Sequence, residues 1–336
     1  MRALRTLTLL FFVAAFAAGA SFWIDYQRFA IAPLTVGVTP RILEVEQGDS
    51  FTRVVEKIAA SGMTNGHPLY WRLLGWRSRT AQRLQVGEYA IVPGTTPTSL
   101  LSQLHLGRVR QYRFTIVEGW NIRELRAALA RRSDVAQTLA GMDDASLMQR
   151  LERTGIHPEG RFLPETYAFV RGESDVDLLR RAASAMDREL QQAWARRAAD
   201  LPIDSAEQAL VLASVIEKET GVASERRRIA GVFARRLKLG MLLQTDPTVI
   251  YGIGVAYAGN ITRRHLETDT PYNTYTRAGL PPTPIAMPGA AAIAAAVDPA
   301  PGDELYFVAR GDGGHEFSAT LAQHNAAFAR FQLGRR

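Results

Sequence analysis

An apolar stretch near the N-terminus constrains this chain more than any other feature. The segment Thr6–Ile24 carries no charged side chain, is preceded by Arg2 and Arg5, and is closed by Asp25. A helix needs about 20 apolar residues to cross the core of a bilayer, so this segment is long enough to span one. Basic residues before the segment and Trp23 at its far end predict a cytoplasmic N-terminus and a periplasmic remainder.

A cleaved signal peptide is the alternative interpretation of the same segment. Ala18-Gly19-Ala20 resembles an A-x-A cleavage site. The apolar region of a signal peptide normally spans only about 7–15 residues, and this one is longer. We therefore favour a stub at residues 1–5 and an uncleaved single-pass anchor at residues 6–24, placed in the inner membrane. Both interpretations export the rest of the chain.

Charge and cysteine content narrow the choice of partner and chemistry. The net charge of +7 suits nucleic acid, an anionic membrane surface or an acidic polymer. Export argues against nucleic acid and favours an extracytoplasmic polymer. The chain has no cysteine, which excludes a thiol nucleophile, disulfides, cysteine-ligated zinc and iron–sulfur clusters. His315-Glu316 lacks a second histidine four residues later, so no zinc-protease motif is present and we expect neither metal nor cofactor.

The region after the anchor predicts a linker at residues 25–39 and a small α+β module at residues 40–110. Its strands are expected at Arg41–Glu46 and Val86–Ile91, with helical patterns after each. The run Val45-Glu46-Gln47-Gly48-Asp49-Ser50-Phe51 resembles a LysM-type carbohydrate-binding module. A folded spacer without a ligand remains an equal alternative. The fold class expected for the whole chain is α+β, with a mixed α/β catalytic domain at residues 111–336.

One predicted helix in that domain places glutamates at the end of an apolar run. Ser205 predicts a helix that begins at Ala206, and Gly221 is a natural stop. At 100° per residue, Glu217 and Glu219 lie 200° apart and cannot face one site together. Glu219 shares its stripe with apolar residues of the helix, whereas Glu217 lies over Ala213 and Ser214.

A carboxyl group held against apolar neighbours should have a raised pKa, because its charged form loses hydration. A carboxyl group that stays protonated near neutral pH can act as a general acid. Glu219 is therefore the better candidate for the catalytic residue. The alternative is that these glutamates are ordinary solvated charges at a helix end.

Several long motifs resemble the YceG-like family of endolytic murein transglycosylases. They occur in the family's order over roughly residues 110–332. They comprise Ala213-Ser214-Val215-Ile216-Glu217-Lys218-Glu219-Thr220, Val232-Phe233-Ala234-Arg235-Arg236-Leu237, Met241–Gly252, Tyr272-Asn273-Thr274-Tyr275, Gly279-Leu280-Pro281-Pro282, Leu305–Ala309, Gly313-Gly314-His315-Glu316-Phe317 and His324-Asn325.

The resemblance implies a specific activity and catalytic residue. The family's catalytic acid is the second glutamate of the E-K-E-T run, here Glu219. The implied reaction cleaves MurNAc–GlcNAc bonds of nascent peptidoglycan without water. It would leave 1,6-anhydro-MurNAc ends and terminate strand elongation. The implied partners are peptidoglycan glycan strands and, further, peptidoglycan synthases (penicillin-binding proteins).

Other residues of these motifs are candidates for substrate binding. Amide and hydroxyl groups suit sugar hydroxyls, and tyrosine rings suit sugar faces, although buried core tyrosines are an equal alternative. Asp246 could instead cap the helix expected at Thr248–Tyr251. His315 and Phe317 are predicted on the returning strand of a hairpin, and His324 and Asn325 on a C-terminal helix. The full set is Glu217, Gln244, Thr245, Asp246, Tyr251, Tyr272, Asn273, Thr274, Tyr275, His315, Phe317, His324 and Asn325.

Two other functions remain open from the sequence. A non-catalytic wall-binding scaffold would also use an anchor, a basic charge and a LysM-like module, but it has no need of a desolvated acid. An ordinary glycosidase would need a second carboxylate about 5–9 Å from Glu219. Only Glu165, Glu217 and Asp246 are candidates for that second carboxylate.

Overall fold

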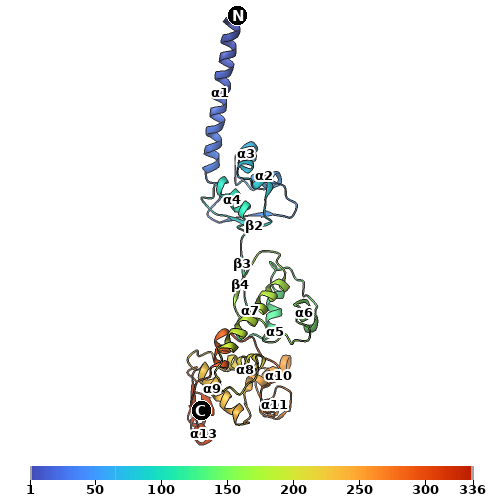
Figure 1. The fold of residues 1–336 in the computed structure, drawn as a ribbon, viewed down its shortest axis with the longest axis vertical. Coiled ribbons are helices and arrows are strands. Elements are labelled where there is room, and N and C mark those ends of the chain that lie inside the picture. Colours follow the sequence, from blue (N-terminus) through green and yellow to red (C-terminus); the bar gives the residue numbers. More distant parts are fainter. Residues whose placement is uncertain (1, 65, 334–336) are drawn as a thin grey trace. The chain divides into compact units, whose positions relative to one another are not determined.

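The computed structural model describes residues 2–64 and 66–333, so Met1 of the stub and residues 334–336 lie outside the description. Contacts along the chain divide it into two compact units, Met1–Tyr112 and Arg113–Arg336 (Figure 1). Short strand pairs among many helices confirm the predicted α+β class. Each unit is considered by itself below.

The first unit begins with the long helix α1 (Arg2–Ile31). Its segment Leu4–Ile31 is long and apolar enough to cross a membrane, a test that a signal sequence also passes. The helix continues without a break through residues 18–20 and past residue 24. Near its end Tyr26 and Ala30 are buried in the core of the module that follows.

The module has the strand–helix–helix–strand–helix order that the sequence predicts. Its antiparallel strands β1 and β2 pair Arg41 with Ile91 and Val45 with Gly87. The Ser50 hydroxyl caps the first helix after the turn. The elements are β1 (Arg41–Val45), α2 (Phe51–Ala60), α3 (Pro68–Arg77), η1 (Thr80–Gln82), β2 (Gly87–Ile91) and α4 (Pro97–Leu106).

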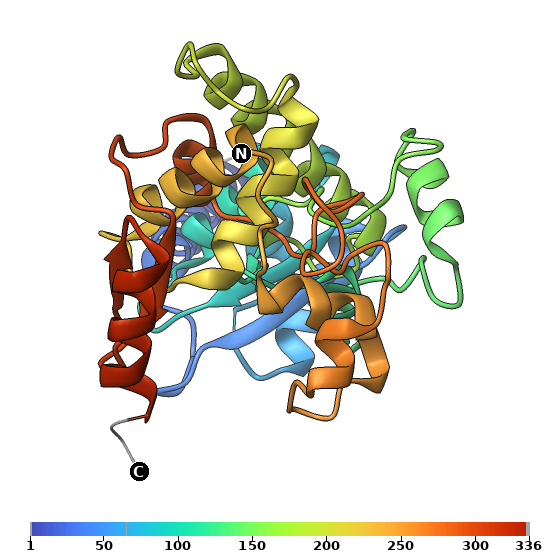
Figure 2. The same ribbon diagram turned by 90° about the horizontal axis from the view of Figure 1, so that it is seen from below.

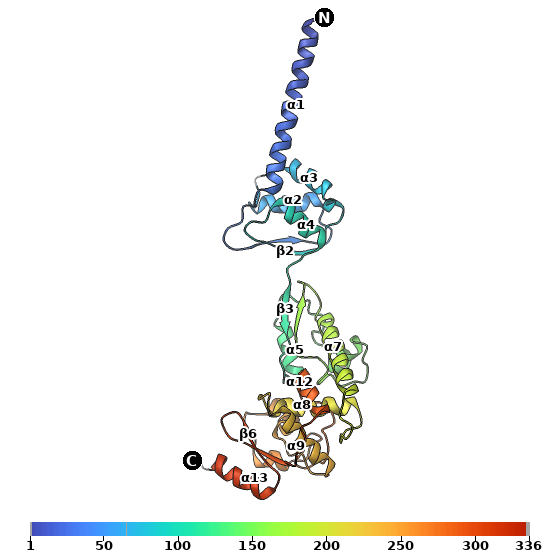
Figure 3. The same cartoon turned by 60° about the vertical axis from the view of Figure 1, so that its left-hand side comes forward.

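The second unit starts with paired strands and a helical layer. Asn121 caps α5 in a reciprocal capping box with Glu124, as expected from the sequence. Figure 3 shows α7 running from the β3–β4 pair towards α8. The elements of this part are β3 (Tyr112–Thr115), α5 (Ile122–Ala130), α6 (Asp144–Arg150), β4 (Thr166–Phe169) and α7 (Asp175–Ala195).

The helix α8 (Ala206–Glu219) forms the centre of the second unit. Its residues 209–216 are all buried, and α7, α9 (Arg226–Lys238) and α12 (Ala290–Val297) pack around it. Ser205 caps its start, which confirms the predicted boundary. The predicted stop is confirmed in position: the helix ends at Glu219, Thr220 is its C-cap, and Gly221 is the next residue. The geometry differs from a glycine cap, because Thr220 already turns the chain into extended geometry. The Thr220 hydroxyl accepts from the Val222 amide, so Gly221 needs no left-handed conformation.

The remaining elements surround the end of α8. They are α10 (Asp246–Ile253), η2 (Gly254–Ala256), α11 (Arg263–Glu267), β5 (Tyr306–Ala309), β6 (His315–Ser318), α13 (Leu321–Phe328) and the π-helical turn η3 (Ala329–Leu333). The predicted hairpin is confirmed, with Ala309 opposite His315. The predicted C-terminal helix is also confirmed, and α13 lies along the hairpin (Figure 2).

Candidate active site

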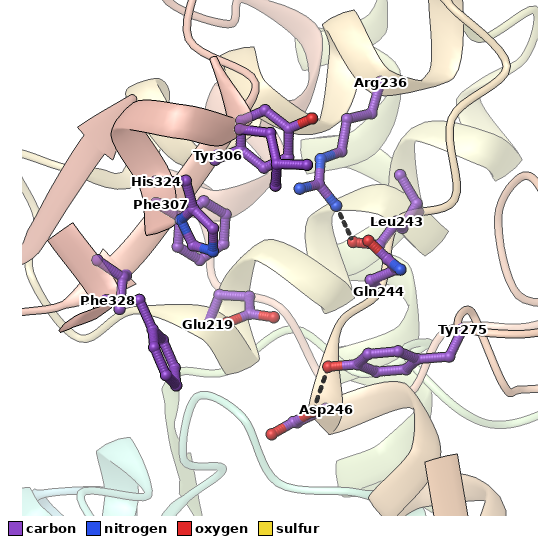
Figure 4. A pocket seen from close by; sticks show the side chains of 12 residues that line it. Glu219, Arg236, Leu243, Gln244, Asp246, Tyr275, Tyr306, Phe307, His324 and Phe328 are labelled. Atoms are coloured by element: carbon purple, nitrogen blue, oxygen red, sulfur yellow. Dashed lines mark hydrogen bonds between the residues drawn. The ribbon is translucent and has the colours of Figure 1, made fainter. Parts of the chain in front are cut away.

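A cavity of about 430 Å³ opens beside the C-terminal end of α8. It gathers side chains from the end of α8, from α9, from the loop into α10, from the β5 strand and from α13 (Figure 4). Glu219 lies at its floor. Aromatic side chains from β5 and α13 line one side of the cavity, and polar side chains such as Gln244 and Asp246 line the other. The lining residues are Glu219, Arg236, Leu243, Gln244, Asp246, Tyr275, Tyr306, Phe307, Val308, Leu321, His324 and Phe328.

Glu219 is the last residue of α8, and its carboxyl group is held in place by Thr245. The Thr245 hydroxyl donates a hydrogen bond to Glu219 Oε1. Burial raises the pKa of Glu219 to about 7, because desolvation outweighs the Thr245 hydrogen bond. The negative charge of Asp246 raises the pKa further, whereas the positive charge of Arg236 lowers it. Near neutral pH this carboxyl group therefore exists partly as an acid that faces an open cavity.

Two other buried threonines hold the backbone of Thr245. The Thr245 amide donates to Thr274 Oγ1 at 3.1 Å, and Thr248 Oγ1 lies 2.9 Å from the same oxygen. The Thr248 hydroxyl also donates to the Thr245 carbonyl at 2.8 Å. Thr245 and Thr274 are both buried, so Thr245 contacts the carboxyl group from behind the cavity wall and Thr274 supports Thr245.

Asp246 lines the cavity and accepts a hydrogen bond of 2.6 Å from the Tyr275 hydroxyl (Figure 4). The predicted cap is wrong, because α10 begins at Asp246 itself and no side chain caps it. Thr245 occupies the capping position, but its hydroxyl is committed to Glu219. The carboxylate of Asp246 is thus left to face the cavity.

Arg236 supplies positive charge to the cavity, and sequence reasoning did not nominate it. Its guanidinium donates to the carbonyls of Leu243 at 2.9 Å and Leu305 at 2.7 Å. It therefore ties the loop before α10 to the strand β5. A signal was present in the sequence: Arg236 continues the buried stripe of Ile229, Val232 and Phe233 at helical spacing. A charged residue on a buried stripe must have hydrogen-bond partners, because burying an unpaired charge costs free energy.

The aromatic wall comes from the hairpin and α13. The His324 ring stacks on Tyr306 with centroids 5.3 Å apart, and Phe307 and Phe328 complete the wall. Burial lowers the pKa of His324, so its ring is neutral at pH 7. Within the described residues its Nδ1 atom is buried without a hydrogen-bond partner. Tyr306, Phe307 and Phe328 were not nominated from the sequence.

Gln244 lines the cavity, and its backbone has a conformation that few residue types adopt readily. Its φ of 52° lies in the left-handed region, and its amide donates to the Thr274 carbonyl at 3.1 Å. Left-handed geometry at a residue other than glycine costs free energy and is common at functional sites. Here it directs the chain from Leu243 into the turn that carries Thr245.

Glu217 lies on another side of α8, as the helical spacing predicts. Its Oε2 accepts from the Gly289 amide at 2.9 Å, and its Oε1 lies 4.0 Å from the Arg226 guanidinium. Burial raises the pKa of Glu217 as well. This glutamate binds the start of α12 and does not line the cavity.

Three motif residues nominated for substrate binding make contacts that hold loops together. The Asn273 amide donates to the carbonyls of Leu266 and Thr268, and its oxygen accepts from the Tyr275 amide. The rings of Tyr251 and Tyr272 lie 4.9 Å apart and pack against the core. None of these side chains lines the cavity.

The hairpin residues also lie behind the cavity wall. His315 Nδ1 lies 2.8 Å from Glu225 Oε2, and the His315 amide donates to Glu225 Oε1. Phe317 packs against the core and carries the Arg228 guanidinium 4.0 Å from its ring centre. Asn325 is exposed on α13, and Glu165 is exposed next to β4. None of these residues lines the cavity.

Sequence reasoning missed a second buried glutamate. Glu159 is fully buried in the loop between α6 and β4. Both of its oxygens lie 3.1 Å from the Ile122 amide at the start of α5, and the Tyr251 hydroxyl donates to Oε2. Burial raises its pKa to about 7. The next residue, Gly160, has a φ of 77°, and a Cβ at this position would lie 2.5 Å from Pro284. This glycine was the sequence signal that could have indicated a tightly packed turn at Glu159.

The chain belongs to the YceG-like family, whose profile matches residues 43–330. It is 31% identical to the endolytic murein transglycosylase of Bacillus subtilis (strain 168) over 264 residues, which cover 74% of this chain and 73% of the relative. It is 22% identical to a protein of that name from Streptococcus pneumoniae serotype 2, covering 90% of this chain and 60% of the relative.

A solved structure agrees with this assignment. A crystal structure at 2.6 Å of a YceG-like protein from Listeria monocytogenes is similar with a TM-score of 0.53 and 27% identity. The similarity covers 86% of this chain and 99% of that one. The family resemblance predicted from the motifs is thus confirmed, and the family match begins inside the N-terminal module.

Proposed function

We propose that this protein is a membrane-anchored endolytic lytic transglycosylase that cleaves MurNAc–GlcNAc bonds in peptidoglycan glycan strands. The observation that carries the proposal is Glu219: a carboxyl group with a pKa of about 7 that faces an open cavity of about 430 Å³. A general acid works best when its pKa lies near the working pH. The names of the relatives support the same reaction class.

The Thr245 hydrogen bond decides which oxygen of Glu219 carries the proton. Because the Thr245 hydroxyl donates to Oε1, the acidic proton resides on Oε2. In the proposed reaction Oε2 protonates the glycosidic oxygen, and the bond to the anomeric carbon of MurNAc breaks. The same carboxylate then accepts the proton of the MurNAc C6 hydroxyl as that oxygen attacks the anomeric carbon. The product is a 1,6-anhydro ring, and Glu219 regains its proton.

The other cavity residues bind and orient the glycan in this proposal. The aromatic wall of Tyr306, Phe307 and Phe328 suits the apolar faces of sugar rings. The side chains of Gln244 and Tyr275 suit hydroxyl and N-acetyl groups. Arg236 favours the carboxylates of the substrate over a neutral polysaccharide.

The proposed location is the inner membrane, with α1 as a single-pass anchor and the second unit in the periplasm. Two observations support an uncleaved anchor. The helix α1 continues unbroken through residues 18–20, and Tyr26 and Ala30 in its last turns are buried in the module. The proposed substrates are nascent strands near the bilayer. Peptidoglycan synthases are the proposed partners, and the LysM-like module is proposed to bind glycan.

Product analysis in ¹⁸O-labelled water tests the reaction. Purified glycan strands incubated with the full chain should yield 1,6-anhydro-MurNAc ends without incorporation of ¹⁸O. Reducing ends that carry ¹⁸O would show hydrolysis instead. Asp246 would then be the second carboxylate, because it is the one candidate of the three that lines the cavity with Glu219. Strands that stay intact but bind to the protein would favour a scaffold.

A further inference from the structure

The helix α3 (Pro68–Arg77) carries large apolar side chains on two opposite faces. Its inner face buries Trp71 and Leu74 in the core of the module. Gly75 on that face lies so close to Phe51 that a Cβ would be 2.3 Å from the Phe51 ring. On the outer face Leu69 and Trp76 are 50% and 72% exposed. A helix at the surface of a soluble domain normally presents polar residues on its outer face.

Aromatic contacts place α3 beside the end of the proposed membrane span. The Tyr70 ring lies 5.2 Å from Phe22, and the Arg77 guanidinium lies 5.3 Å from the centre of the Trp23 ring. About 20 residues cross the bilayer core, and the charge-free stretch of α1 ends at Ile24. Phe22 and Trp23 therefore lie at the membrane–water interface if α1 spans. Since α3 contacts these residues, it lies at the same level.

The charged side chains of α3 and of the segment that follows it are all positive. No acidic residue occurs between residues 58 and 87, whereas four arginines do. These arginines are all exposed: Arg72, Arg77, Arg79 and Arg83. Basic residues near a bilayer attract anionic lipid headgroups, and tryptophan is enriched at that depth.

We propose that α3 and η1 form a membrane-binding surface that lies in the headgroup region of the bilayer. Leu69 and Trp76 insert among the acyl chains nearest the interface, and the arginines bind lipid phosphates. The occupant of this apolar face is the anionic bilayer that holds α1, because α3 packs directly on α1 at the interfacial level. The inference rests on the proposed anchor and goes beyond it. The module is then held flat against the membrane by two elements.

The absence of cysteine gives a clean test in the full chain. Single-cysteine variants are spin-labelled and reconstituted into vesicles of phosphatidylethanolamine and phosphatidylglycerol. The variants Trp76→Cys and Leu69→Cys probe the proposed surface, and either one suffices if the other fails to fold. Glu44→Cys is the matched control, because Glu44 is exposed on β1, whose partner β2 lies on the side of the module away from α1 (Figures 1 and 3). Phe12→Cys probes α1.

For each label we compare two accessibilities. One is to oxygen, which partitions into lipid, and the other is to a nickel chelate, which stays in water. We expect lipid-type accessibility at positions 69 and 76 and water-type accessibility at position 44. Labels at 69 and 76 that resemble position 44, with position 12 in lipid, would overturn the surface and leave the anchor intact. A water-exposed label at position 12 would overturn the anchor, and the surface with it. Cleavage activity on soluble strands is measured separately and reports on neither.

A separate variant tests whether the arginines of the proposed surface bind lipid phosphates. Replacing Arg72, Arg79 and Arg83 together by glutamine should move the label at position 76 towards water. The shift should be largest in vesicles rich in phosphatidylglycerol. Arg53→Gln on α2 is the control, because Arg53 is exposed and lies 3.5 Å from Glu56. An unchanged depth in the triple variant would contradict lipid binding by the arginines.

Discussion

Two glutamates of the second unit have the same shifted pKa but opposite access to solvent. Burial raises the pKa of both Glu159 and Glu219 to about 7. Glu159 is fully buried and accepts hydrogen bonds from the Ile122 amide and the Tyr251 hydroxyl. Glu219 accepts from Thr245 and lines a cavity of about 430 Å³.

The difference shows that a raised pKa alone does not identify a catalytic acid. Glu159 binds the first amide of α5, the position where a helix favours an acceptor, and thereby joins the loop at residues 157–163 to the helix. A substrate cannot reach it. Glu219 has one oxygen bound to the protein and the other facing the cavity. In our proposal, access to the cavity separates the proton donor Glu219 from the structural carboxyl group of Glu159.

Replacing Glu219 by glutamine should have the largest effect. Glu219→Gln has nearly the same shape but cannot deliver a proton, so turnover should fall by about 10²–10⁴-fold. Its thermal unfolding should be unchanged or raised. Glu217→Gln is the matched control on the same helix and should keep most of the activity, because its partner is the Gly289 amide. Equal losses in both variants would contradict a single acid.

The same replacement at Glu159 should change stability and spare catalysis. A carboxyl group whose pKa is raised on folding stabilises the protein at low pH, and that stability is lost as pH rises through its folded pKa. A rise from 4.5 to about 7 corresponds to roughly 3 kcal/mol lost between about pH 4.5 and pH 8. Thermal unfolding followed from pH 5 to pH 8 should therefore depend less on pH in Glu159→Gln than in the unmodified protein. A turnover loss as large as that of Glu219→Gln would remove the contrast between the two glutamates.

Thr245→Val removes the hydroxyl that donates to Glu219. That hydrogen bond lowers the pKa of Glu219, so its loss should raise the pKa and move the alkaline limb of kcat/KM to higher pH. Turnover should fall roughly tenfold, the cost of losing one hydrogen bond to a charged group. Thr245→Ser, which keeps the hydroxyl, should retain both the rate and the profile. A valine variant with an unchanged profile would mean that Thr245 does not control the carboxyl group.

Asp246→Asn should shift the same limb in the opposite direction by a smaller amount. The negative charge of Asp246 raises the pKa of Glu219, so removing it should move the alkaline limb to lower pH. Glycan products should keep their anhydro ends. Loss of all turnover in Asp246→Asn, together with ¹⁸O-labelled products from the unmodified protein, would instead indicate a two-carboxylate hydrolase.

The sequence predicted much of the helix that carries Glu219 and less of the cavity around it. Helical spacing separated Glu219 from Glu217, because both lie on one regular element. The cavity wall comes from elements far apart in the chain, so spacing could not show that Tyr306, His324 and Arg236 meet there. Motif residues such as Asn273 and Tyr251 make hydrogen bonds within the protein, and a motif does not distinguish such a bond from a contact with substrate. Glu159 was missed because its partner amide is 37 residues away.

The pH dependence of kcat/KM for cleavage of purified glycan strands tests the central claim most directly. If Glu219 donates the proton from its position in the cavity, kcat/KM should be level at acidic pH and fall tenfold per pH unit above about pH 7. The same limb should be present in Glu159→Gln, whose buried carboxyl group takes no part. A limb near pH 4.5, the ordinary range of a glutamate, would contradict a desolvated acid at Glu219. So would a limb near pH 7 that disappears in Glu159→Gln.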